Sequence, residues 1–195
     1  MHSGTPSETK IIGGERVSNS TDQRAAFSTV RLLYYGTGPT STGGECTGTV
    51  IGPGHIVTAA HCIKPISTLN ISAPRDKREF EPIAATAHPD WDGSFGHFTH
   101  DIGVISFRIK PNTLSTSADS VDLMPLELAE DGQAAPGSEL VLAGFGDRND
   151  GHPEIGSLYQ VRTSIHTINI INSDFEIAQG TGKGPCNGDS GDFDT

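Results

Sequence analysis

The sequence has no long hydrophobic run: no stretch of about 18 consecutive apolar residues, the length of a membrane-spanning helix, occurs among its 195 residues. We therefore predict no transmembrane helix and no membrane partner. Residues 1–10 are polar and also lack the apolar core of an export signal. If the protein is secreted, we expect its export signal to lie outside this chain.

Basic residues and cysteines are both scarce. Thirteen Lys and Arg face 24 Asp and Glu, which gives a net charge of −11 and excludes nucleic acid binding through phosphate neutralisation. The three cysteines are Cys46, Cys62 and Cys186. An odd number leaves at least one thiol without a partner within the chain.

Short β-rich runs separated by turn residues make up most of the sequence. Val, Ile, Thr, Leu and Tyr concentrate in runs bounded by Gly, Pro and Ser clusters, and helical periodicity is weak. This pattern predicts an all-β protein, with one helical turn over 59–63 and a polar link between two β units over 111–124. The expected strands cover 27–35, 46–51, 55–58, 102–107, 139–143 and 159–171.

Four short motifs carry the chemistry. In chain order they are Lys10-Ile11-Ile12-Gly13-Gly14, Thr58-Ala59-Ala60-His61-Cys62, His100-Asp101-Ile102 and Gly188-Asp189-Ser190-Gly191. Each alone has a plain reading as a surface segment or turn. A serine nucleophile, however, needs a base within reach and N–H donors for the oxyanion, and the set offers both.

In this order the motifs resemble those of the trypsin/chymotrypsin-like serine proteases over residues 11–191. The order histidine, aspartate, serine differs from that of the subtilisin-like and α/β-hydrolase enzymes. The resemblance implies that Ser190 is the nucleophile, His61 the general base and Asp101 the acid that orients it. It also implies that the N–H groups of Gly188 and Ser190 form the oxyanion hole. The predicted activity is peptide-bond hydrolysis through an acyl-enzyme, on peptide or protein substrates.

The resemblance further implies that the chain is a zymogen. An activating protease would cut after Lys10, and the new amine of Ile11 would pair with Asp189 to order the oxyanion hole. Gly184 would lie at the base of the specificity pocket. Because it carries no charge, it favours an uncharged P1 side chain.

A disulfide between Cys46 and Cys62 is implied in the same way, as the bridge that braces the histidine loop. Such a bridge needs an oxidising compartment, so we expect a secreted, extracellular or periplasmic protein. The family's partner for Cys186 follows the nucleophile serine, and no such cysteine is present. Cys186 is therefore expected to be a free thiol.

The implied fold consists of two antiparallel β-barrels of the six-stranded type, the second incomplete at its C-terminal end. Its expected divisions are a leader over 1–10, a barrel with His61 and Asp101 over 11–115, and a partial barrel with Ser190 over 116–195. After Gly191 the chain reads Asp192-Phe193, where the family commonly has Gly-Pro and continues for several dozen residues. A truncated sequence, a missing second chain or a lost tail would each explain this, and we expect the isolated chain to be weakly active or inactive.

Two other segments match functional motifs only in part. The sequence His97-x-x-His100-Asp101 lacks a third metal-ligand motif, and the glycine-rich segment 180–184 lacks the Lys-Ser/Thr ending of a phosphate loop. We therefore predict no metal and no cofactor. The competing hypothesis is a catalytically impaired protease homologue that acts as a binding module.

Overall fold

Short antiparallel strands form nearly all of the regular structure. The computed structural model describes residues 14–18, 23–35, 44–63, 66–73, 78–93, 100–110, 123–130, 133–146, 157–168 and 175–177. Its strands are β1 (Glu15–Arg16), β2 (Thr29–Tyr34), β3 (Gly44–Gly52), β4 (His55–Thr58), β5 (Leu69–Ser72), β6 (Phe80–Ala87), β7 (Gly103–Ile109), β8 (Glu139–Gly144), β9 (Tyr159–Ile168) and β10 (Phe175–Ile177). The helical elements are α1 (Gln23–Ser28) and two 3-10 turns, η1 (Ala60–Cys62) and η2 (Ile66–Thr68).

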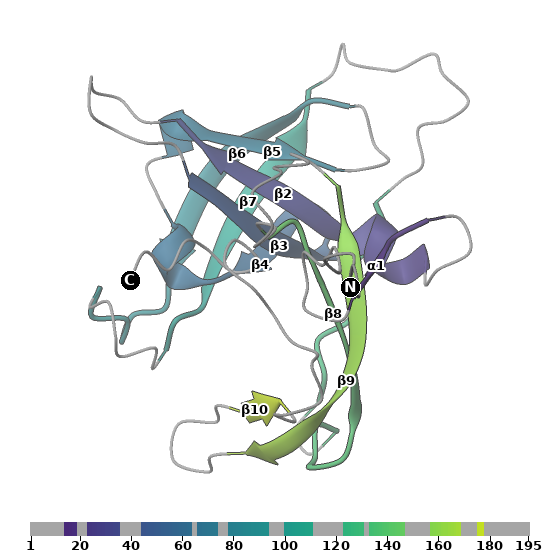
Figure 1. Ribbon diagram of the computed structural model, residues 1–195. Coiled ribbons are helices and arrows are strands. Elements are labelled where there is room, and N and C mark those ends of the chain that lie inside the picture. Colours follow the sequence, from purple (N-terminus) through teal and green to yellow (C-terminus); the bar gives the residue numbers. More distant parts are fainter. Residues whose placement is uncertain are drawn as a thin grey trace, which may run out of the picture.

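Six of these strands close into a barrel in the order β2-β3-β4-β7-β6-β5 (Figure 1). All six pairings are antiparallel, and the longest joins β6 to β7, from Phe80 opposite Ile109 to Ala87 opposite Gly103. Closure leaves no strand of this sheet with a free edge.

Buried and exposed side chains alternate along the barrel strands, and the buried ones fill the interior of the barrel. In β7, for example, Ile105 and Phe107 are buried while Val104 and Arg108 face outwards, as the two-residue period of a strand requires. The rings of Phe80 and Phe107 meet edge to face, with centroids 5.6 Å apart. The buried cluster consists of Val30, Leu32, Tyr34, Cys46, Val50, Ile56, Cys62, Leu69, Ile71, Phe80, Ile105 and Phe107.

A second antiparallel sheet is built around β9. The whole of β8 pairs with it, from Glu139 opposite Ser164 to Gly144 opposite Tyr159, and the short strands β1 and β10 also pair with β9. Figure 1 shows the long β8–β9 pair extending beyond the barrel, with β10 near its far end. The backbone N–H of Phe145 donates to Thr47 Oγ1 at 3.2 Å and so ties the end of β8 to β3.

The all-β prediction is confirmed, and each expected strand coincides with an observed one. The first expected strand began too early, because Phe27 and Ser28 belong to α1 and the Ser28 hydroxyl donates to the carbonyl of Arg24 at 2.7 Å. The helical turn expected over 59–63 is η1. Strands β1, β5, β6 and β10 were not predicted, and most of the expected link over 111–124 lies outside the described residues.

Candidate active site

His61 is placed by a short turn that follows directly on a barrel strand. β4 ends at Thr58, and η1 begins two residues later. The turn is closed by backbone bonds from Cys62 N–H to the carbonyl of Ala59 at 3.1 Å and from Ile63 N–H to that of Ala60 at 2.8 Å. The side chain of His61 is 8% exposed. The turn thus holds an imidazole at the end of the barrel, largely shielded from water.

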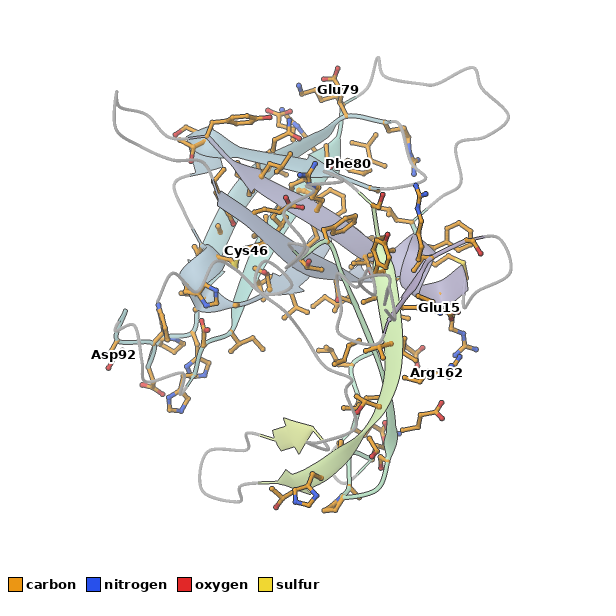
Figure 2. The ribbon with its side chains drawn as sticks, viewed as in Figure 1. Glu15, Cys46, Glu79, Phe80, Asp92 and Arg162 are labelled. Atoms are coloured by element: carbon orange, nitrogen blue, oxygen red, sulfur yellow. A yellow bond between two sulfur atoms is a disulfide. The ribbon has the colours of Figure 1, made fainter. Side chains whose placement is uncertain are left out.

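A disulfide joins this turn to the neighbouring strand. Cys46 of β3 is bonded to Cys62, and their Cα atoms are 6.3 Å apart. Both residues belong to the barrel core. The predicted pairing is therefore confirmed, and it fixes the residue next to His61 to the barrel wall, where Figure 2 labels Cys46.

Tyr34 supports the turn from a third strand. Its buried phenol donates a hydrogen bond to the backbone carbonyl of Cys62. Burial raises the pKa of Tyr34 far above its usual range, so this hydroxyl stays protonated and remains a donor. The carbonyl next to His61 is thereby satisfied within the core.

Asp101 lies just before β7 and contacts His61, although the two residues are far apart in the sequence. Its Oδ1 accepts the backbone N–H of His61 at 2.8 Å, and its Oδ2 lies 2.6 Å from His61 Nδ1. The carboxylate side chain is 11% exposed. In the neutral form of an imidazole, such a bond places the proton on Nδ1, because a carboxylate only accepts, and leaves Nε2 as the acceptor nitrogen.

Gly103 sets how closely the two segments approach. A Cβ atom at this position would lie 2.8 Å from Cγ1 of Ile63 and 3.2 Å from the carbonyl oxygen of Thr86. Ile63 follows η1, and Gly103 opens β7 two residues after Asp101. The missing side chain therefore lets the histidine turn pack directly on the strand that follows the aspartate.

The structure thus brings together His61, Asp101 and the disulfide of Cys46 with Cys62. The other predicted site residues lie outside the described part of the chain: Lys10, Ile11, Gly184, Cys186, Gly188, Asp189 and Ser190. Sequence reasoning missed Tyr34 and Gly103, which act on the site only through the fold. The glycine two positions after Asp101 is the one signal that could have pointed to a close approach.

Metal ligation finds limited support in the described residues. One group of possible ligands, Cys46, His61 and Cys62, has its ligand atoms within 4.8 Å of one another. Both sulfurs are bonded to each other, so neither is a thiolate that could bind a metal. His97, of the sequence His97-x-x-His100-Asp101, lies outside the described residues.

No helix among the described residues is long and apolar enough to span a membrane.

A closed antiparallel barrel, a second antiparallel sheet and a shielded histidine–aspartate pair together define a double-barrel protein of the serine protease type. The chain belongs to the trypsin family, because the family model named Trypsin matches residues 16–192. Both the resemblance drawn from the motifs and the predicted double-barrel fold are confirmed.

Individual relatives agree with this assignment. Granzyme C of Mus musculus is 26% identical over 191 residues, which cover 93% of this chain and 70% of granzyme C. The solved structure of GrC matches with a TM-score of 0.61 and 18% identity over 80% of this chain. Neuropsin, a serine protease expressed in the limbic system of mouse brain, matches with a TM-score of 0.65 and 19% identity over 93%. The match spans 66% of the GrC structure, just under two thirds, and 80% of the neuropsin structure.

Proposed function

We propose that the protein is a serine endopeptidase that uses His61, Asp101 and Ser190 as its catalytic triad. The observation that carries the proposal is the two-point contact between His61 and Asp101, at 2.8 Å through the backbone N–H and 2.6 Å through Nδ1. Such a contact holds one tautomer and one ring orientation, which is what a general base needs. Membership of the trypsin family supports the same chemistry.

In the proposed mechanism the Ser190 hydroxyl attacks the scissile carbonyl while Nε2 of His61 takes its proton. The N–H groups of Gly188 and Ser190 stabilise the oxyanion, and His61 then returns the proton to the leaving amine. Asp101 keeps Nδ1 protonated and stabilises the imidazolium through the bond already described. Water hydrolyses the acyl-enzyme by the same steps.

The protein is proposed to be made as a zymogen and activated by an external protease. Cleavage after Lys10 frees the amine of Ile11, which pairs with Asp189 and orders the oxyanion hole. We propose the leader at 1–10, the barrel unit at 11–115 and the Ser190-bearing unit at 116–195 as its divisions. The disulfide supports a secreted, oxidising location, as does membership of a family that includes granzymes.

Gly184 is proposed to form the base of the P1 pocket. Because glycine offers no charge to pair with Lys or Arg, uncharged P1 side chains should be preferred. Matched peptides that differ only at P1 test this proposal. Faster cleavage after Lys or Arg than after any uncharged residue would overturn it.

A fluorophosphonate probe tests the triad directly, because it reacts only with a serine whose hydroxyl is activated. The full-length protein, cleaved after Lys10 and checked by mass spectrometry for an Ile11 terminus, should be labelled at Ser190. The Ser190→Ala variant should lose the label, whereas Ser164→Ala, which alters a serine of β9, should keep it.

Uncleaved protein should label much more slowly if activation follows the proposed route. Failure of the cleaved, folded full-length protein to react with the probe would reject the enzyme. That outcome would favour the alternative, a catalytically impaired homologue that acts as a binding module.

A further inference from the structure

We infer that His100 is a positioning residue for Asp101 and that the ring of His88 holds it in place. The inference rests on the proposed function, because it concerns the carboxylate that orients the proposed general base. It assigns a role to two histidines that lie outside the triad. Four features of the described residues carry it: a backbone conformation, a tight turn, a ring stack and a strand-end hydrogen bond.

The backbone of His100 is unusual. Its φ angle is +62°, and it is the one non-glycine residue with a positive φ among those that the structure describes. This left-handed conformation is costly for most side chains, above all for β-branched ones; Gly adopts it freely, and Asn, Asp and His are enriched there among the other residues. It turns the chain sharply just before Asp101.

A three-residue turn centred on Asp101 follows. The N–H of Ile102 donates to the carbonyl of His100 at 2.8 Å, which closes a ring around the aspartate. The direction of the Asp101 side chain is thereby tied to the conformation of the residue before it. A change in the backbone at His100 would rotate the carboxylate.

His88 holds both neighbours of Asp101. It follows the last residue of β6, and its N–H donates to the carbonyl of Ile102 at 2.8 Å. Its imidazole stacks on that of His100, with ring centroids 4.9 Å apart and planes inclined by 16°. One residue thus clamps Ile102 through the backbone and His100 through the ring.

The ring of His88 is itself held in place. Its Nδ1 accepts the N–H of Asp90 at 3.2 Å, and the Asp90 carboxylate lies 3.9 Å from the same nitrogen. The chain then turns back through a bond from Trp91 N–H to the carbonyl of His88 at 3.0 Å. Figure 2 shows Asp92 of this segment at the end of the barrel opposite Glu79. The stacking partner of His100 therefore has a hydrogen bond of its own that favours one ring orientation.

Accurate placement matters because Asp101 uses both of its oxygens on His61. One oxygen meets the backbone N–H and the other meets Nδ1, so a small rotation of the carboxylate breaks at least one bond. His100 is exposed and is not part of the buried core. Its contribution is therefore expected in the geometry of the pair rather than in burial.

The test reads the proton shared by His61 and Asp101 in ¹H NMR spectra of the protein labelled with ¹⁵N-histidine. This resonance is assigned by its absence in His61→Ala. His100→Val should shift it upfield or remove it, because a β-branched residue disfavours the left-handed turn by about 5- to 30-fold. His100→Asn, which tolerates that conformation, should retain most of the signal.

The stack is tested separately at His88. His88→Ala should weaken the shared-proton signal, whereas His88→Phe should preserve it by keeping a flat ring beneath His100. His166→Val, which alters an exposed histidine of β9, is the matched control and should change nothing. Circular dichroism and thiol counting confirm that each variant is folded with its disulfide intact.

An unchanged resonance in folded His100→Val, or equal loss in the Val and Asn variants, would overturn the inference. The measurement involves neither Ser190 nor turnover, so it can fail while the proposed function stands, and the reverse also holds. In the active enzyme, His100→Val should lower kcat more than it changes KM, and His100→Asn should restore kcat.

Discussion

At the scale of single residues, two adjacent tyrosines show how burial decides a side chain's role. Tyr34 is 7% exposed and donates to the carbonyl of Cys62, whereas Tyr35 is 62% exposed at the end of the same strand. The first tyrosine therefore supports the turn that carries His61. Tyr35 carries the same phenol group in an exposed position and therefore serves as the control.

We expect Tyr34→Phe to lower the free energy of unfolding by about 1–3 kcal/mol, because it leaves a buried carbonyl without its donor. Tyr35→Phe should stay within about 0.5 kcal/mol of the parent. Urea unfolding followed by circular dichroism at neutral pH measures both. Equal stability of the two variants would show that the phenol of Tyr34 does not support the turn.

Tyr34 should also make the stability of the folded protein depend on pH in the alkaline range. The pKa of Tyr34 in the folded protein lies above the ordinary value of 10.0 that it takes when unfolded. The stability from its protonated form is therefore complete below that value and is lost as the pH rises towards the folded pKa. The parent should thus lose more stability than Tyr34→Phe when unfolding is repeated above pH 10.

At the scale of elements, the sequence predicted strands wherever β-branched and large apolar residues alternate. β6 escaped because it contains Pro82 and three alanines in place of such residues, and proline cannot donate to a strand ladder. The register shift between Pro82 and Ala84 accommodates that proline. β5 escaped because only one of its four residues, Ile71, is β-branched, whereas β4, of equal length, has three; the place of β5 in the barrel comes from pairing with β2.

Packing between elements yields a further prediction, at Gly103. Gly103→Ala should destabilise the protein by about 1–3 kcal/mol, because the new methyl group would overlap Ile63 where the histidine turn meets β7. In an Ile63→Ala background the same change should cost much less. Gly44→Ala is the matched control, since a Cβ there meets nothing within 4 Å.

Chemical denaturation of the parent, Gly103→Ala, Ile63→Ala and the double variant completes a double-mutant cycle. Simple additivity of the Gly103 and Ile63 changes would mean that the two residues do not limit each other's approach. The shared-proton resonance of His61 offers a second readout, because a displaced turn should also shift it.

At the scale of the whole molecule, the pairing of His61 with Asp101 depends on barrel closure. The two residues are 40 positions apart, and they meet because β4, which leads to His61, pairs with β7, which follows Asp101. The motifs named both residues in advance because each lies in a characteristic local sequence. Tyr34 and His88 lie in no such sequence. His100 stands beside Asp101 in the motif, but its proposed role arises only from the turn and the ring stack that surround it.

The disulfide links the histidine turn covalently to β3. It stabilises the fold mainly by restricting the unfolded chain. Closing a loop between residues 16 apart should contribute about 3 kcal/mol. Replacing both cysteines, Cys46→Ser with Cys62→Ser, should therefore lower the melting temperature by about 6–12 °C in a chain of this length. Calorimetry under oxidising conditions measures the change.

Dithiothreitol should lower the parent's melting temperature similarly and leave the double variant unaffected. The Cys186→Ser variant is the control for a cysteine outside the bridge. A parent that melts at the same temperature as the double variant would show that the bridge adds nothing to the barrel's own packing.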